Sequence, residues 1–345
     1  MTSPFRGCLP PGCVTGVGSL PFLDADEAVE FVAQQCPELP FWPQLPRRTA
    51  GEGVIVQGLG RLIKYLEPAH RPYCWSVRPG AGPAFEAALD DGEAGLSPET
   101  AAGFFALERA IGSGRFPAAR AVKTQLEGPA TLARCLFLDG TPMSRIHGWL
   151  ERLAGFLERQ AAWQVRRLRN LGLPVILMLD EPALSLIDDS GHSASTVATT
   201  LRCVLDAARL EGAAVGIHCC APLPSSAFAG LGLDLLSFDA HLSVADDGFF
   251  DLAHDILNGG GSLAFGLAPT GPSSMTAESM ETRWLALASL LGDPHDVAAR
   301  TVVTATCGLG LSTRAETFKS FTLARRTGDA IRSHATRAPL GWPTQ

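Results

Sequence analysis

The sequence predicts a (β/α)8 TIM barrel, an α/β fold in which eight parallel strands alternate with helices. Two observations support this prediction. Strand-like and helix-like segments alternate along the 345 residues. Polar and reactive residues follow the strands, at the end where barrels of this kind build their active sites. An open, doubly wound sheet is the alternative, but it would place a ligand at a single switch point and would not gather groups from several strands.

Eight apolar or alternating segments are the expected strands. They are short, and several are bounded by Gly and Pro, as is typical of strands in a parallel sheet. In chain order they are Cys13–Leu20, Leu39–Trp42, Ala119–Leu126, Val175–Leu179, Ala214–Ile217, Leu233–Phe238, Ser262–Leu267 and Val302–Thr306.

Six segments are expected to be helices. In Leu150–Leu171 apolar residues recur every three or four positions, and Gly172 and Pro174 end the pattern. Asp24 or Asp26 would cap the first helix. The expected helices are Asp24–Gln35, Pro98–Ile111, Leu150–Leu171, Thr196–Gly212, Glu278–Leu291 and Arg314–Ser333.

We expect residues 1–345 to form one catalytic barrel domain, since 46% of the residues are hydrophobic and can bury a large core. The stretch from about 43 to 98 is rich in Gly and Pro. It is expected to be a long loop region, and such loops often act as binding loops or lids.

The charge distribution excludes several classes of partner. The net charge is −7 and the 28 Lys and Arg residues do not form basic runs, so neither a nucleic acid nor a membrane surface is expected. No uncharged apolar stretch reaches about 18 residues, so no transmembrane helix is expected.

The nine cysteines are an odd number, and the N-terminal residues lack the apolar core of a signal peptide, which favours a reducing cytoplasm. A small molecule is the expected substrate.

Side chains at the ends of the fifth and eighth strands form a candidate metal site. Residues i and i+2 of an extended chain point to the same side, so His218 and Cys220 should face one point and Cys219 should face away. Cys307 follows the eighth strand. One imidazole and two thiolates are a ligand set that zinc favours. The spacing alone fits buried core cysteines equally well.

Six motifs, taken in order, resemble the catalytic barrel of the cobalamin-independent methionine synthases. Related barrels include the uroporphyrinogen decarboxylases and the zinc methyltransferases that methylate coenzyme M. The resemblance spans nearly the whole chain but only one of the two barrels of the full-length enzymes, as in the shorter single-barrel form of the family. The motifs are VTGVGSLPF (14–22), LEGPATLA (126–133), LDEPAL (179–184), GIHCC (216–220), LLSFDA (235–240) and TCGLGLSTR (306–314).

The resemblance implies zinc ligands at His218, Cys220 and Cys307. In the family a glutamate after the sixth strand is the fourth ligand, and Asp239 occupies that place here. Because aspartate is one methylene shorter, water or His241 is the alternative for this position.

The resemblance also implies a substrate site. The Gly-Ser turn of the family contacts the amino-acid part of homocysteine, and the aspartate of its Asp-Glu-Pro-Ala motif binds the substrate amino group. Gly18, Ser19 and Asp180 match these residues. Glu127 is expected to line the same pocket, with hydrogen bonds to loop amides as the alternative, whereas Glu181 is expected to be structural.

These observations predict a zinc-dependent methyltransferase that acts on a small thiol, with homocysteine as the expected acceptor and methionine as the product. No aromatic residue follows Gly128 and Pro129 until Phe137, so the tryptophan that stacks on folate in the family has no counterpart. A methyl-corrinoid such as methylcobalamin, free or on a corrinoid protein, is therefore the expected donor. The alternatives are a decarboxylase of the uroporphyrinogen type and a non-catalytic barrel that binds zinc and a thiol.

Overall fold

The fold is built on a curved sheet of seven parallel strands. The computed structural model describes residues 7–184, 192–223, 225–242 and 248–336. Neighbouring strands follow the order β1-β11-β10-β9-β8-β7-β4. Their bounds are β1 (Cys13–Val14), β4 (Val122–Glu127), β7 (Val175–Asp180), β8 (Ala214–Cys219), β9 (Leu235–Asp239), β10 (Ser262–Ala268) and β11 (Thr301–Ala305).

An irregular segment joins the two edges of this sheet. Phe41 forms a parallel bridge with Lys123 of β4, and Gln44 forms one with Ser19, which follows β1. The amide of Lys123 donates to the carbonyl of Pro40 at 2.8 Å, which strengthens the first bridge. The predicted strand at 39–42 is thus present only as isolated bridges. The chain forms the expected (β/α)8 barrel, with this segment in place of a regular strand.

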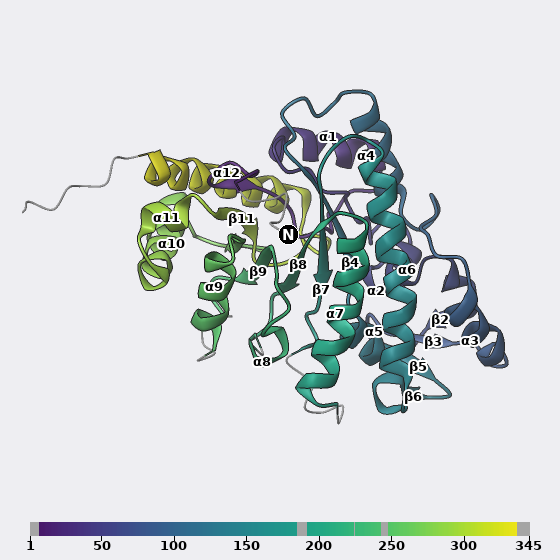
Figure 1. Ribbon diagram of the computed structural model, residues 1–345. Helices are drawn as coiled ribbons and strands as arrows, with labels where there is room; N and C mark the ends of the chain where they lie inside the picture. The colour runs from purple at the N-terminus through teal and green to yellow at the C-terminus, as the bar shows by residue number, and fades with distance from the viewer. Residues whose placement is uncertain (1–6, 185–191, 224, 243–247, 337–345) are drawn as a thin grey trace, which may run out of the picture.

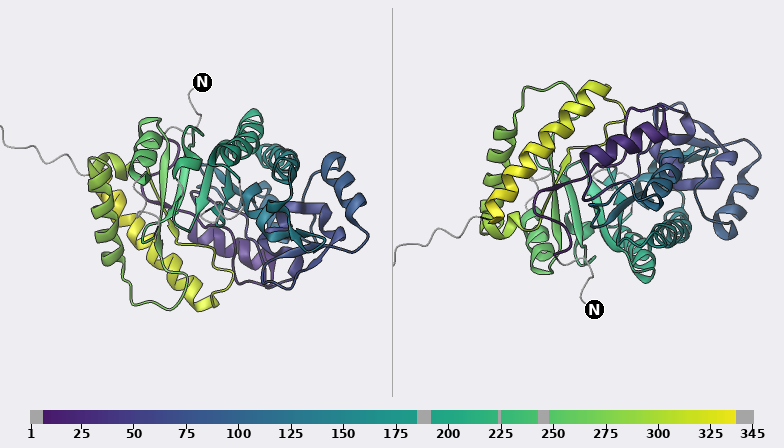
Figure 2. Two further views of the ribbon diagram at one scale, coloured as in Figure 1. Left: turned by 90° about the horizontal axis from the view of Figure 1, so that it is seen from below. Right: turned by 90° about the horizontal axis from the view of Figure 1, so that it is seen from above.

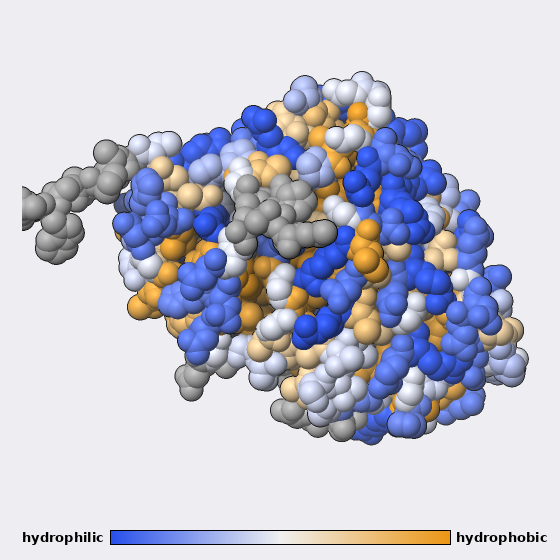
Figure 3. All heavy atoms as spheres, in the orientation of Figure 1, coloured by the Kyte–Doolittle hydropathy of each residue, from blue (hydrophilic) through white to orange (hydrophobic). Residues whose placement is uncertain are grey.

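Helices cover the outer side of the sheet (Figures 1 and 2). Their apolar faces pack against the strands, as in α6, where Leu153, Leu157 and Val165 are buried. Hydrophilic side chains predominate on the outer surface over α6 and α7 (Figure 3). The longer helices are α1 (Ala25–Gln35), α4 (Ala102–Gly112), α6 (Trp149–Arg169), α7 (Ala194–Leu210), α9 (Phe249–Asn258), α10 (Ala277–Leu291) and α12 (Arg314–Thr336). The short ones are α5 (Pro129–Cys135), α8 (Ser225–Phe228), α11 (Pro294–Ala298) and the 3-10 helix η3 (Met143–Arg145). None of the helices in the described ranges combines the length and the apolar character needed to cross a membrane.

The stretch 43–98 is not the long loop that its composition predicted. It folds into short elements, and its strands join β5 (Leu136–Leu138) and β6 (Thr141–Pro142) in a second sheet of order β2-β3-β5-β6. Strands this short gain stability mainly from pairing with segments distant in sequence, which composition does not reveal. The elements are η1 (Ala50–Glu52), α2 (Val54–Leu59), η2 (Gly60–Tyr65), β2 (Leu66–Pro68), β3 (Trp75–Val77) and α3 (Gly82–Asp91).

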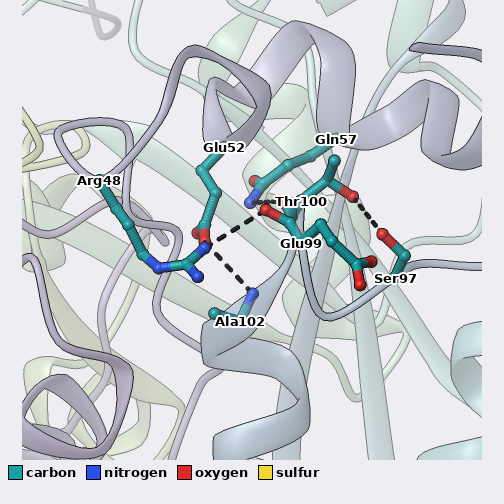
Figure 4. Close-up of polar contacts among 7 residues, drawn as sticks. All are labelled: Arg48, Glu52, Gln57, Ser97, Glu99, Thr100 and Ala102. Carbon is teal, nitrogen blue, oxygen red and sulfur yellow. Dashed lines mark hydrogen bonds and ion pairs between the residues drawn. The ribbon is translucent and has the colours of Figure 1, made fainter. Parts of the chain in front are cut away.

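A partly buried polar cluster fixes the first part of this stretch to the start of α4 (Figure 4). Arg48 Nη1 lies 2.6 Å from Glu52 Oε1, and the same oxygen accepts from the amide of Ala102 at 3.4 Å. Gln57 Nε2 donates to the carbonyl of Thr100 at 2.8 Å. The Glu52 side chain is fully buried, and burial raises its pKa although Arg48 opposes the shift. The cluster therefore holds α2 in place beside β4.

The barrel interior changes character along the strands. Alternate residues face inward, and near the N-terminal ends of the strands these form an apolar cluster. Its members are Cys13, Leu39, Ala121, Ile176, Met178, Ala214, Leu235, Ala264 and Val302. Two or four residues further along the same strands, the inward positions hold Lys123, Gln125, Asp180 and His218. The barrel is thus packed with apolar side chains below a polar C-terminal end.

Candidate functional site

Four polar side chains form a row across neighbouring strands at this end of the barrel. The register pairs Glu127 with Asp180, Asp180 with His218, and His218 with Ser237. All four residues are less than 9% exposed. Residues paired in this way lie on the same face of the sheet, so one buried surface carries two carboxyl groups, an imidazole and a hydroxyl. The expected Glu127, Asp180 and His218 are therefore neighbours.

The structure brings His218, Cys220 and Cys307 together. One potential ligand atom from each lies within 4.8 Å of the others. The two sulfur atoms are 3.2 Å apart. His218 Nδ1 is 2.9 Å from the hydroxyl of Ser237, and Nε2 makes no hydrogen bond of ordinary geometry among the described residues. Ser237 thus orients the imidazole so that Nε2 is available to a metal, as outer partners of metal-binding histidines commonly do.

Cys219 points away from this cluster, as the alternation along an extended strand predicted. Its side chain is fully buried in the apolar layer between the sheet and the helices. Burial raises the pKa of this thiol to about 12. Cys219 is consequently a core residue, while its neighbour Cys220 faces the barrel end.

Asp239, the expected fourth ligand, does not join the three ligand atoms. Its Oδ1 accepts hydrogen bonds from the amides of His241 at 2.7 Å and Leu242 at 3.2 Å. The short side chain therefore closes a turn after β9, a role for which aspartate is well suited. His241 does not replace it, since its Nε2 lies 3.3 Å from the carbonyl of Leu267. The structure thus brings together three of the four expected ligands.

The thiol pair favours one thiolate. The hydrogen bond with Cys220 lowers the pKa of Cys307, burial opposes this effect, and the nearby His218 lowers the pKa further. The same contact, together with burial, raises the pKa of Cys220. One negative charge is thus shared by two soft sulfur donors beside an open imidazole nitrogen. A donor set of this kind fits zinc.

Two carboxyl groups beside the cluster each have one oxygen without a hydrogen-bond partner in the described part of the chain. Glu127 Oε1 and Asp180 Oδ1 are buried and accept no hydrogen bond among the described residues. Burial raises the pKa of Asp180 to about 6, with Lys123 and His218 acting against the shift. Burial, Asp180 and Glu181 raise the pKa of Glu127 well above its ordinary value. Because buried acceptors are normally paired, these two oxygens suit a ligand that donates hydrogen bonds or carries positive charge.

Glu181 is structural, as expected. Its carboxylate accepts from the amides of Ala130 at 3.0 Å and Thr131 at 2.9 Å, and from the Thr131 hydroxyl at 2.6 Å. These contacts satisfy free amides in the first turn of α5, where a negative charge is also favourable. Burial still raises its pKa, to about 7. The two neighbouring acids after β7 thus have different environments.

The Gly18–Ser19 turn lies against the loop that follows β11. Ser19 Oγ accepts from the amide of Gly310 at 3.2 Å, and the Ser19 carbonyl accepts from Leu309 at 2.8 Å. A Cβ atom at Gly18 would lie 2.4 Å from Gln44 Oε1, so no larger residue fits without movement. The turn is therefore joined to the loop that carries Cys307.

Lys123 is a further residue of the barrel end that we did not expect from the sequence. Its Nζ is buried and donates to the carbonyl of Val17 at 2.6 Å and to Gln125 Oε1 at 3.1 Å. Burial lowers its pKa to about 8, against the effect of Asp180. In AVKTQLE the polar residues 123, 125 and 127 alternate with 122, 124 and 126, and this pattern was the available signal.

The fold and site define a (β/α)8 barrel with a histidine–cysteine–cysteine cluster at the C-terminal ends of its strands. Comparisons with protein-family models and with curated proteins give no match. Among solved structures, the chain is similar to a B12-independent methionine synthase from Shewanella sp. W3-18-1 in complex with selenomethionine. The sequence identity is 13%, the TM-score is 0.60, and the match covers 94% of this chain and 98% of that one.

Two further solved structures show the same architecture. A methyltransferase from Methanosarcina mazei has 13% identity and a TM-score of 0.52, with 94% of each chain covered. The pneumococcal virulence factor StrH, described in terms of N-glycan recognition and hydrolysis, has 8% identity and a TM-score of 0.50, with 96% and 85% covered. At these identities the likenesses establish the fold, and the chemistry has to be argued from the site.

Proposed function

We propose that this protein is a zinc-dependent methyltransferase that transfers a methyl group to a small thiol, with homocysteine as the acceptor and methionine as the product. The observation that carries the proposal is the convergence of His218, Cys220 and Cys307 at the C-terminal end of the barrel. Two of the structurally similar proteins, a methionine synthase and a methyltransferase, support the same class of reaction.

The three residues would hold the metal through Nε2 of His218 and the two sulfur atoms. When bound, zinc would deprotonate an acceptor thiol at neutral pH and position its sulfur, with three protein ligands leaving a coordination position for the acceptor. Ser237 orients the imidazole through Nδ1. The thiolate shared by Cys220 and Cys307 supplies negative charge at the position where a dication is expected.

Glu127 and Asp180 would bind the amino group of the acceptor. Each has a buried oxygen without a partner, and an ammonium group between them could donate to both. A positive charge at this point also favours the ionised carboxylates, which burial alone disfavours. Gly58 of α2 packs against Glu127, because a Cβ atom there would lie 3.5 Å from the Cβ of Glu127.

We propose a methyl-corrinoid as the donor, either free or carried by a partner protein. Helix α5 (Pro129–Cys135) contains no aromatic side chain that could stack on a folate ring. This feature supports a donor other than folate.

The metal site is tested by zinc analysis of protein purified without chelator. We expect about one zinc per chain in the wild type and in Cys219→Ser, because Cys219 faces the core, and loss of zinc in Cys220→Ser and Cys307→Ser. Cys219→Ser is the matched control, since it changes the adjacent cysteine without touching the cluster. Less than half an equivalent in the wild type, or equal loss in all three variants, would contradict the proposal.

A further inference from the structure

A cavity of about 500 Å³ lies where the stretch 43–98 meets the loop that follows β11. Its walls come from the segment 46–55, from the segment 68–75 that connects β2 to β3, and from Gly310 and Leu311 after β11. Most of these residues belong to the stretch 43–98, which the sequence analysis expected to be a loop region. The volume is within the range typical of small-molecule sites.

Direct contacts connect the cavity to the loop that carries Cys307. Arg47 Nε donates to the carbonyl of Gly310 at 3.0 Å, and Arg47 Nη2 donates to the carbonyl of Leu311 at 2.8 Å. The Gly310 amide in turn donates to Ser19 Oγ at 3.2 Å. Gly310 follows Cys307 by three positions, and three residues of chain span at most about 11 Å. A ligand in the cavity would thus lie near the reacting end of the barrel.

The charge of the cavity is opposite to that of the chain. Arg47, His70 and Arg71 line it, and none of the described lining residues is acidic. The whole chain carries 35 acidic and 28 basic residues. Arginine side chains suit carboxylate and phosphate groups through paired hydrogen bonds. The cavity therefore selects for negative charge.

Two aromatic rings line the same cavity. Trp75 is held in β3, which pairs with β2 on one side and β5 on the other. Tyr73 is 67% exposed and has a φ of 60°. This backbone conformation is unfavourable for a bulky residue, and strained residues with exposed side chains are characteristic of ligand sites. The rings offer flat apolar surfaces next to the cationic groups.

We infer that this cavity binds the methyl donor through a planar aromatic group that carries negative charge. The inference rests on the proposed function and adds the location and chemistry of the donor. The aromatic phosphodiester tail of methylcobalamin and the pterin and glutamate groups of methyltetrahydrofolate share this chemistry. The two sources are distinguished by experiment.

Cys74 provides a measure of occupancy, because this residue lines the cavity between Tyr73 and Trp75. The zinc-loaded protein is treated with N-ethylmaleimide, and the rate of modification is followed by peptide mass spectrometry. Methylcobalamin or methyltetrahydrofolate at saturation should slow modification of Cys74 at least about fivefold and leave that of the exposed Cys203 on α7 unchanged. The donor that protects identifies the source. Benzimidazole, an uncharged planar ring, should protect much less.

Two variants test the recognition without endangering the fold. Tyr73→Gly removes the ring and relieves the positive φ, so thermal stability should not fall while the protection constant weakens about tenfold. Asp139→Gly is the matched control, because Asp139 has a φ of 48° and does not line the cavity. Arg71→Ala should also weaken protection about tenfold.

Two outcomes would overturn the inference. One is the absence of Cys74 protection by both donors, and the other is full protection in Tyr73→Gly and Arg71→Ala. Zinc content and homocysteine binding are measured in the same preparations. Loss of those properties would instead contradict the proposed function, so the two failures can be told apart.

Discussion

Replacing the buried lysine of the barrel should change how stability depends on pH. Burial lowers the pKa of Lys123 from its ordinary value of 10.5 to about 8. The unfolded chain therefore binds this proton more tightly than the folded chain, and the lysine destabilises the fold wherever it is protonated in both states. The difference between the two pKa values, at about 1.4 kcal/mol per pKa unit, corresponds to a destabilisation of the folded protein by about 3 kcal/mol. This contribution is absent above pH 10.5 and is fully present below the folded pKa of about 8.

The measurement is urea unfolding of the wild type and of Lys123→Met at pH 7 and pH 10. The stability of the wild type relative to the variant should rise by about 2 to 3 kcal/mol between these values. Lys64→Met is the matched control, since Lys64 is exposed on η2, and its difference from the wild type should stay nearly constant. Parallel profiles for the wild type and Lys123→Met would refute the reasoning.

Two further substitutions test the surroundings of the metal cluster. Ser237→Ala removes the hydroxyl 2.9 Å from His218 Nδ1 and should weaken zinc binding by about 10- to 100-fold in competition with a chelator, whereas unchanged affinity would exclude the orienting role. Asp239→Ala should retain zinc but lower stability by about 1 kcal/mol, because Asp239 caps a turn. Loss of the metal in this variant would show that the carboxylate is a ligand after all.

Much of the barrel could be predicted because each strand carries its own local signal. Val175–Asp180 is a short apolar run that stops at an acidic residue, and the periodicity of α6 is visible without tertiary information. The same alternation predicted that Cys220 and Cys219 face opposite sides of β8. Placement of His218 and Cys307 near each other followed from parallel strands that end at one face.

The remaining features depend on contacts between distant segments. The segment 39–44 lies between β1 and β4 but forms only isolated bridges, and β3 exists because it pairs with β5 some 60 residues later. The hydrogen bonds that hold Asp239 in a turn were not predicted. The sequence shows that a carboxylate is present but does not show which backbone amides donate to it. The alternation in residues 121–127 places Lys123 on the same side as Gln125 and Glu127, but it does not show that this side is the barrel interior.

The most direct test of the account is methyl transfer to homocysteine by the zinc-loaded protein. Methylcobalamin and methyltetrahydrofolate are supplied separately, and methionine is measured by mass spectrometry. The account predicts methionine from methylcobalamin with the wild type and with Cys219→Ser, and none with Cys307→Ser. Turnover with the folate alone would overturn the proposed donor. Zinc-loaded wild-type protein that forms no methionine from either donor would contradict the central claim.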